Sequence, residues 1–355
     1  MATFNLERVS ILVADDSAFM RSLLTRVFRI LGARQILEAG DGQAAVEAMR
    51  SLADDRAPAA GPGTIDLIVS DYFMQPVDGL MLLRWVRRGK DTPDRFMPFF
   101  MLSAAADRDI VVEARDAGVT EFIGKPFSVN SILSKLAGLI DRPRQFVFTA
   151  TYFGPDRRRR NLAFGAVERR TITEDEIRIV YAEATPSRDA LRTAKVWLFR
   201  PPNAIKRKIG VGAGSGSATI DPALIASAEA QISEMGEDYV DWVRESVAEL
   251  AREHRHAVDR PDEAPSRYRA INKLALELRG QGGMFGYPLV TEFGASLFLC
   301  TGGSPRITDN HLALVKAHID AIRAVINDKV SGDGGAIGRE LMAGLAQAKE
   351  KYESA

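Results

Sequence analysis

Four short apolar segments near the start of the chain are each followed by residues that can take part in chemistry. Asp15 and Asp16 follow the first, Asp71 ends the second, Ser103 follows the third and Lys125 follows the fourth. Apolar runs of this length, bounded by polar residues, predict buried strands. Parallel strands of an open α/β sheet bring their carboxyl ends to one edge, so we expect these side chains to meet there. The segments are Ile11–Ala14, Ile65–Asp71, Phe99–Leu102 and Glu121–Gly124.

This set of side chains suits phosphoryl transfer assisted by a divalent cation. Neighbouring carboxylates repel each other, and Mg²⁺, which prefers oxygen ligands and phosphate groups, holds them together. The Lys125 ammonium can neutralise a phosphoryl group, and the Ser103 hydroxyl can donate to one of its oxygens. Asp71 is then the candidate nucleophile, with an acyl phosphate as product. The alternative is a set of unrelated strand-end acids and a solvated lysine, which the order and spacing of the residues disfavour.

The motifs at these positions resemble those of a known family. They are the acidic pair Asp15-Asp16, the segment from Ser70 to Gly79 around Asp71, Ser103 with the small Ala104, the aromatic Phe122 and the pair Lys125-Pro126. Residues 8–141 with these motifs resemble the receiver domain of two-component response regulators, the CheY-like family. The resemblance implies that Asp71 is the phosphoacceptor.

The same resemblance implies a metal site and an orientation for the lysine. Asp16, Asp71 and the backbone carbonyl of Phe73 would bind Mg²⁺, with Asp15 acting through water. The Lys125–Pro126 peptide bond is usually cis in this family, which would direct the lysine into the site.

A switch is also implied by the resemblance. Phosphorylation would draw Ser103 toward the phosphate and reposition Phe122, whose ring lacks the hydroxyl of the tyrosine in many relatives. The chain departs from the family pattern where Gln75 stands between Met74 and Pro76. This difference affects the loop after Asp71 but removes no reacting group.

The periodicity of the first part predicts an α/β fold. Ser17 is placed to cap a helix that Gly32 ends, and Ser128 begins another helix with one apolar face. Strands that alternate with amphipathic helices indicate a doubly wound parallel sheet of five strands, covered on both faces. We assign this receiver domain to residues 1–143.

Residues 144–218 read as a basic, partly extended linker. They include Arg157–Arg160, Arg169-Arg170 and a stretch rich in Gly and Ser, Gly210–Ser217. The favoured interpretation is a solvated connection with some extended pieces. The arginines beside Tyr152 and Phe153 leave open a contact with an anionic ligand or nucleic acid, and a cyclic-dinucleotide module is a remote alternative.

Residues 219–355 carry the spacing of an antiparallel helical bundle, in which Asp221 and Pro222 begin the first helix. The segment around Leu276 resembles the histidine phosphotransfer (Hpt) signature, with Arg279, Gly280 and Gly282 at its basic and small positions. Leu276 replaces the phosphorylatable histidine, so a degenerate Hpt-like domain is implied over roughly residues 222–330. The glycines serve either close helix packing or a retained docking surface on which Leu276 would be exposed.

Composition limits the possible classes of protein. The chain has 355 residues, 46% of them apolar, and 47 basic residues balance 47 acidic ones, so its charge gives no argument for nucleic acid or membrane. One cysteine, Cys300, excludes an intramolecular disulfide framework and fits a reducing cytoplasm. No apolar run predicts a membrane span.

We therefore expect a cytoplasmic response regulator that is not an enzyme. Its partners would be a histidine kinase or Hpt phosphodonor and a protein that reads the switch, and a homodimer is compatible with the bundle. The alternatives are a scaffold that docks other receivers or kinases, a transferase that passes the phosphate onward, which Leu276 opposes, and a DNA-binding regulator. The last lacks a helix-turn-helix pattern with a basic recognition helix.

Overall fold

A computed structural model describes residues 6–54, 64–105, 107–157, 177–180, 196–201, 203–209, 221–303 and 307–353. The chain forms two compact units, Met1–Ile123 with Val129–Ala228, and Gly124–Ser128 with Glu229–Ala355. Within the described ranges, no helix combines the length and the apolar character needed to cross a membrane. Arg158–Arg160, Arg169-Arg170 and Gly210–Ser217 lie outside the described residues.

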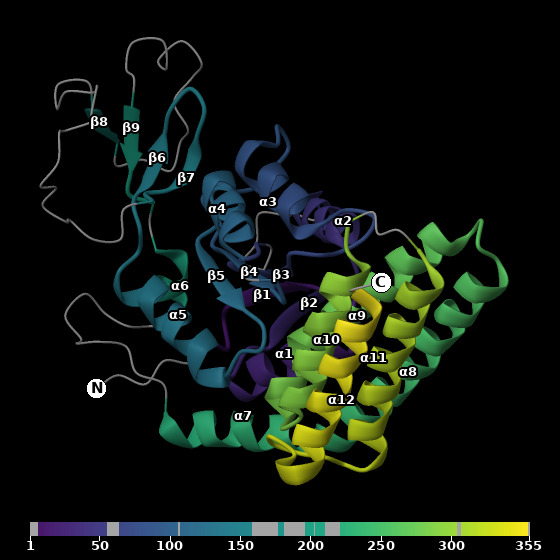
Figure 1. Cartoon of the computed structure of the whole chain (residues 1–355). Coiled ribbons are helices and arrows are strands. Elements are labelled where there is room, and N and C mark those ends of the chain that lie inside the picture. The colour runs from purple at the N-terminus through teal and green to yellow at the C-terminus, as the bar shows by residue number, and fades with distance from the viewer. Residues whose placement is uncertain are drawn as a thin grey trace, which may run out of the picture. The chain divides into compact units, whose positions relative to one another are not determined.

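The first unit is built on a five-stranded parallel sheet, which confirms the predicted fold class (Figure 1). Its strand order is β2-β1-β3-β4-β5, so the direction of winding reverses between β1 and β3. Open α/β sheets place their sites at such a reversal. The strands are β1 (Ser10–Ala14), β2 (Gln35–Ala39), β3 (Leu67–Asp71), β4 (Phe99–Ser103) and β5 (Glu121–Gly124).

Helices cover both faces of this sheet. Figure 1 shows α2, α3 and α4 on one face and α1 and α5 on the other. The residues of β1, β3 and β4 are buried throughout, as expected for strands covered on both sides. The helices are α1 (Ala18–Ile30), α2 (Gly42–Asp54), α3 (Gly79–Arg88), α4 (Arg108–Ala117) and α5 (Val129–Asp141).

Residues at both ends of α1 explain where this helix begins and ends. The Ser17 hydroxyl accepts a hydrogen bond from the Met20 amide at the start of α1, which satisfies one of the amides that a helix leaves unpaired. Gly32 follows this helix with φ of 93°, a conformation that glycine adopts without a steric penalty. Both predicted signals for α1 are thus confirmed.

The described residues of the region predicted as a partly extended linker include a second sheet. It contains β6 (Phe146–Phe148), β7 (Phe153–Pro155), β8 (Ile177–Val180) and β9 (Val196–Phe199), in the order β7-β6-β9-β8. Phe146, Phe153, Trp197 and Phe199 pack around Phe96 of the receiver in one buried cluster. Burial of these aromatic rings stabilises a sheet whose strands are too short to be recognised by periodicity. A short helix, α6 (Ala204–Lys208), follows.

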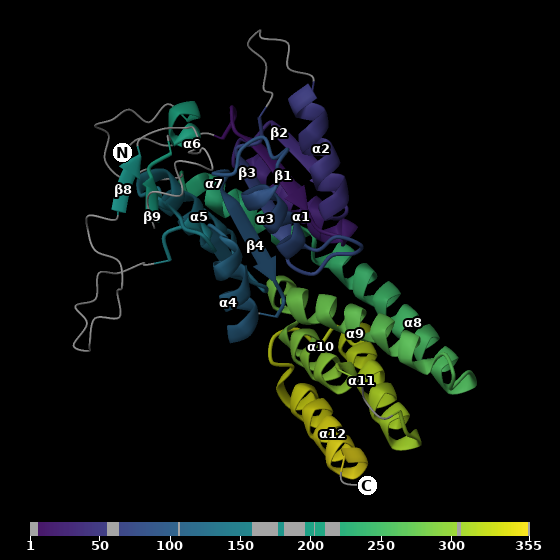
Figure 2. The same cartoon turned by 90° about the horizontal axis from the view of Figure 1, so that it is seen from above.

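The second unit is mainly helical. Helices α8, α9, α10 and α11 pack in a closed ring of neighbours, and α12 packs on α11 (Figure 2). This arrangement confirms the predicted bundle. The helix that begins at Pro222 ends at Glu234, and the next helix begins at Gly236, directly after Met235. The helices of this unit are α8 (Gly236–Asp259), α9 (Ala264–Gln281), α10 (Pro288–Thr301), α11 (Asp309–Asn327) and α12 (Gly335–Glu353), with a 3-10 turn, η3 (Gly282–Phe285), between α9 and α10. The preceding helix, α7 (Pro222–Glu234), has its first residues in the first unit and its last residues in the second.

The Hpt-like segment lies at the end of α9. Leu276 is 8% exposed, so it is not presented on the surface as the docking alternative would require. A Cβ atom at Gly282 would lie 2.5 Å from the Tyr287 carbonyl oxygen, and one at Gly294 would lie 2.7 Å from the Arg279 amide nitrogen. At Gly282, close packing is therefore sufficient to explain the glycine.

Candidate functional site

Asp71 ends β3, at the edge where the winding of the sheet reverses. Ala14 pairs with Ser70 in the β1–β3 register, so Asp15, the next residue after β1, comes level with Asp71. Asp71 itself pairs with Leu102 of β4, and Ser103 is the next residue of that strand. Neighbouring strands are about 4.8 Å apart. The register thus brings together the first three predicted strand ends.

Hydrogen bonds orient the two buried carboxylates. Asp15 is 1% exposed and Asp71 is 7% exposed. The Ser17 amide donates to Asp15 Oδ1 at 2.9 Å, and the Phe73 amide donates to Asp71 Oδ2 at 3.0 Å. Arg21 Nη1 donates to the backbone carbonyl oxygen of Asp15 at 2.6 Å. These bonds fix the orientation of the carboxylate oxygens, as a nucleophile or a metal ligand requires.

Ser103 is fully buried, and its hydroxyl is held by the loop that follows β4. Its Oγ donates to the Ala105 carbonyl oxygen at 2.9 Å and accepts from the Ala105 amide at 3.1 Å. Both bonds tie the hydroxyl to the β4–α4 connection. Binding of a phosphoryl oxygen by this hydroxyl would therefore exchange the donor bond to Ala105 for a new one.

The remaining predicted residues lie on and after β5. Phe122 is half-buried and packs against the main core of the sheet. Lys125 directly follows the strand, and its bond to Pro126 is cis, as expected. The Gln75–Pro76 bond, in the loop where the sequence departs from the family pattern, is also cis. That Lys125 meets a phosphoryl group on Asp71 stays a prediction.

Two features beside Asp71 were not singled out from the sequence. A Cβ atom at Gly79 would lie 2.0 Å from the Asp71 carbonyl oxygen, so only glycine fits this first residue of α3. The Tyr72 hydroxyl donates to Glu113 of α4 at 2.9 Å, and Arg84 of α3 binds the other oxygen of that carboxylate at 3.0 Å. Burial, with this carboxylate, raises the pKa of Tyr72. The Asp78-Gly79 pair before an amphipathic run was the available signal for the glycine, whereas nothing in the sequence indicated the Tyr72 contact.

The donor set fits Mg²⁺ better than a softer metal. Asp15, Asp16, Asp71 and the Phe73 carbonyl offer oxygen atoms alone, which hard cations prefer. Within the described part of the chain, no three side chains of Asp, Glu, His or Cys converge closely enough to hold a metal by themselves. Magnesium sites commonly use one or two carboxylates and complete their shell with water and phosphate. The residues present therefore fit this ion.

Comparison with known proteins agrees with this geometry. Residues 11–137 match the family described as "Response regulator receiver domain". The chain is 32% identical over 134 residues to "Chemotaxis protein CheY" of Pseudomonas aeruginosa, covering 38% of this chain and 98% of that protein. It is 33% identical over 135 residues to "Transcriptional regulatory protein PdtaR" of Mycobacterium tuberculosis, covering 38% of this chain and 58% of that protein.

A solved structure, the CheX-CheY-BeF3-Mg+2 complex from Borrelia burgdorferi, is 25% identical, with 37% of this chain and 88% of that chain covered and a TM-score of 0.32. The family match ends before the second sheet and the helical bundle begin.

Proposed function

Because the chain belongs, through residues 11–137, to the response regulator receiver family, we propose that it is a phosphorylation switch in which Asp71 accepts the phosphoryl group. The observation that carries this proposal is the strand register, which sets Asp15 level with Asp71 and Ser103 one residue beyond it on β4. The proposed role is that of a signalling switch rather than an enzyme.

The metal site proposed for this switch consists of Asp16, Asp71 and the Phe73 carbonyl, with Asp15 bound through water. When bound, Mg²⁺ supplies positive charge that neutralises the carboxylates and the phosphoryl oxygens. Hydrogen bonds from the backbone amides of Ser17 and Phe73 hold the carboxylates of Asp15 and Asp71 in place.

In the proposed reaction, an Asp71 carboxylate oxygen attacks the phosphorus of a phosphohistidine on a histidine kinase or Hpt protein. The phosphorus–nitrogen bond breaks, an oxygen–phosphorus bond forms, and the histidine leaves with the electron pair and takes a proton. The Lys125 ammonium forms an ion pair with the transferred group.

The switch that follows is read by a protein partner or by the chain's own helices. Ser103 gives up its bond to the Ala105 carbonyl oxygen and donates to a phosphoryl oxygen. Phe122 then moves from its half-buried position, and the surface formed by α4, β5 and α5 changes. Phosphorylation acts by shifting the populations of two states.

We propose that the helical bundle is a degenerate Hpt-like module. The ring of α8, α9, α10 and α11 supports this interpretation, as do Arg279 and Gly280 at their positions after Leu276. Leucine has no nucleophile, so the module would bind a protein without passing phosphate onward.

Intact mass spectrometry tests the switch. Full-length protein is incubated with acetyl phosphate and Mg²⁺, alongside Asp71→Asn. We expect the wild type to gain one phosphoryl group and the variant none, because an amide cannot form the acyl phosphate. As a matched control, Asp66→Asn removes a carboxylate at the other end of the same strand, and its protein should still be labelled.

An unlabelled wild type, under conditions that label a control receiver, would contradict the proposal. The chain would then be better described as a scaffold that docks other signalling proteins.

A further inference from the structure

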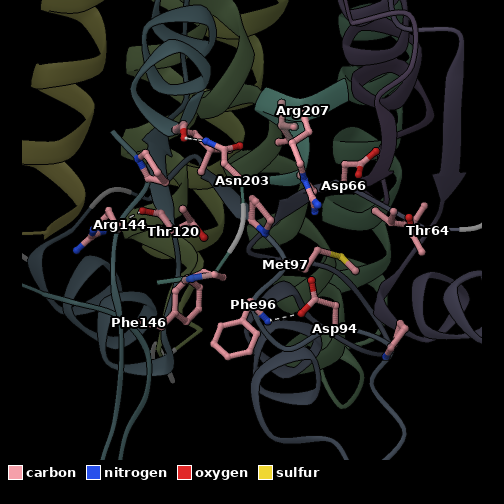
Figure 3. Close-up of a pocket in the computed structure, with 18 of the residues that line it drawn as sticks. Thr64, Asp66, Asp94, Phe96, Met97, Thr120, Arg144, Phe146, Asn203 and Arg207 are labelled. Atoms are coloured by element: carbon pink, nitrogen blue, oxygen red, sulfur yellow. Dashed lines mark hydrogen bonds between the residues drawn. The ribbon is translucent and has the colours of Figure 1, made fainter. Parts of the chain in front are cut away.

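A pocket of about 360 Å³ lies within the first unit, at the end of the sheet opposite to Asp71 (Figure 3). Asp66 directly precedes β3, Pro98 precedes β4 and Thr120 precedes β5, and all three line it. The five residues of β3 separate the two ends by about 16 Å. Phe146 of β6 and Ile205 of α6 close the pocket from the second sheet and the segment after it.

Most of the lining is apolar and preformed. Phe96, Met97, Phe146 and Ile205 are each at most 8% exposed. The rings of Phe96 and Phe146 meet edge to face, with centroids 5.2 Å apart, and Figure 3 shows them side by side at one end of the pocket. A volume of this size is at the lower end of the range for small-molecule sites, and aromatic walls favour a flat apolar body.

The charged groups around the pocket differ in their hydrogen-bond and ion-pair partners. Lys208 Nζ pairs with Asp66 Oδ2 at 2.6 Å, and the Phe96 amide donates to Asp94 Oδ1 at 2.8 Å. Arg144 donates to the Thr120 carbonyl oxygen at 3.1 Å. The Arg207 guanidinium, by contrast, has no side-chain hydrogen bond or ion pair with any residue that the structure describes, and in Figure 3 it reaches from α6 into the pocket.

We propose that this pocket binds a small organic anion with an aromatic body of one or two rings. The body would lie between Phe96, Phe146 and Met97, and its anionic group would face Arg207. The carboxylate of Asp66 does not oppose an anion, because Lys208 already neutralises it. A preformed apolar space beside Arg207, for which no described residue supplies an ion-pair partner, is complementary to such a molecule.

Two fluorescent probes of nearly the same shape test both parts of the proposal. 1-Anilinonaphthalene-8-sulfonate carries the anionic group, and N-phenyl-1-naphthylamine is the same body without it. We expect both to bind the full chain at one site. Arg207→Gln should weaken binding of the sulfonate about threefold to fivefold, as for an exposed ion pair, and leave the neutral probe unchanged.

Neighbouring residues of α6 give matched variants. Lys206→Gln removes the same charge from a residue that does not line the pocket, and it should leave both affinities unchanged. Ala204→Trp places a ring in the pocket and should abolish binding of both probes. Equal effects of Arg207→Gln and Lys206→Gln on the sulfonate would overturn the assignment of an anionic ligand.

Methyl resonances of the methionines locate the probe without relying on a variant that fails to fold. Met49 and Met97 line the pocket, whereas Met81 and Met342 are exposed elsewhere. We expect the sulfonate to shift the first pair and leave the second pair unchanged. Unshifted Met49 and Met97 at saturating probe would overturn the site.

Discussion

Arg87 of α3 holds together three segments of the first unit, although its charge is completely buried. Its guanidinium donates to the carbonyl oxygens of Gly118, Arg95 and Met97 at 2.8–2.9 Å and to Thr120 Oγ1 at 3.3 Å. Burial lowers the pKa of Arg87 to about 10, which still leaves it charged at neutral pH. Such a cation is tolerated because the surrounding acceptors replace its water.

Replacing Arg87 tests this role. Arg87→Met leaves several buried carbonyl oxygens without a donor, so we expect the free energy of unfolding to fall by about 3 kcal/mol. Urea unfolding of the receiver measures the loss. Arg88→Met, at the exposed next position of α3, is the matched control, with an expected change of at most about 0.5 kcal/mol. Equal losses in the two variants would show that the buried network does not stabilise the fold.

His318 is the corresponding buried group of the bundle. Its Nδ1 donates to the Leu314 carbonyl oxygen, so Nε2 accepts from the Ser296 hydroxyl at 2.7 Å. Burial lowers the pKa of His318 from 6.5 to about 4 in the folded protein. The hydrogen bond to Leu314 acts in the opposite direction and offsets only part of this shift. The folded state therefore contains the neutral ring at neutral pH.

The stability of the bundle should depend on this ring. As the pH falls from about 6.5 to about 4, His318 becomes protonated in the unfolded chain but stays neutral in the folded protein. The free energy of unfolding therefore decreases by up to about 3 kcal/mol over this range. Urea unfolding at several pH values should show this dependence of the free energy of unfolding on pH in the wild type, and a weaker dependence in His318→Gln. His256→Gln, at an exposed position of α8, should retain the wild-type slope. An unchanged slope in His318→Gln would contradict the assignment.

At the scale of elements, the contact between α9 and α10 depends on Gly294. A helix interior normally disfavours glycine by about 1 kcal/mol relative to alanine. A Cβ atom at Gly294, however, would lie 2.7 Å from the Arg279 amide nitrogen and 3.1 Å from the Ala275 carbonyl oxygen. Both contacts are with backbone, which cannot move aside as a flexible side chain can.

We therefore expect Gly294→Ala to lower the free energy of unfolding by about 1–3 kcal/mol, because overpacking outweighs the helix propensity. At Gly344, in α12 of the same bundle, a Cβ atom would meet no described atom within 4 Å apart from the neighbouring backbone of its own helix. Gly344→Ala should raise stability by up to about 1 kcal/mol. Chemical unfolding of both variants shows whether the free energy of unfolding falls or rises in each. A Gly294→Ala variant that is more stable than the wild type would refute the close packing.

The receiver and the bundle could be predicted from the sequence, and the second sheet could not. Asp15, Asp71 and Ser103 were recognisable because each ends an apolar strand, and Ser17 and Gly32 mark the ends of α1. Strands β6–β9 have only three or four residues, too few to display a period. Arg87 was missed because an arginine on an amphipathic helix usually faces solvent.

At the scale of the whole molecule, the chain joins a receiver domain to further modules. The family match covers the five-stranded sheet and most of α5, and ends before the pocket-lining segment around Arg144 and before the bundle. The chemistry proposed for Asp71 lies at one end of the sheet and the pocket at the other. Failure of either proposal leaves the other intact, since they share no residue.

The most direct test of the central claim is to identify the residue that carries the phosphoryl group in the full chain. After incubation with acetyl phosphate and Mg²⁺, borohydride reduces an acyl phosphate of aspartate to homoserine, and peptide mass spectrometry locates the product. The proposal predicts homoserine at position 71 alone. Unmodified Asp71 together with homoserine at another aspartate would contradict it.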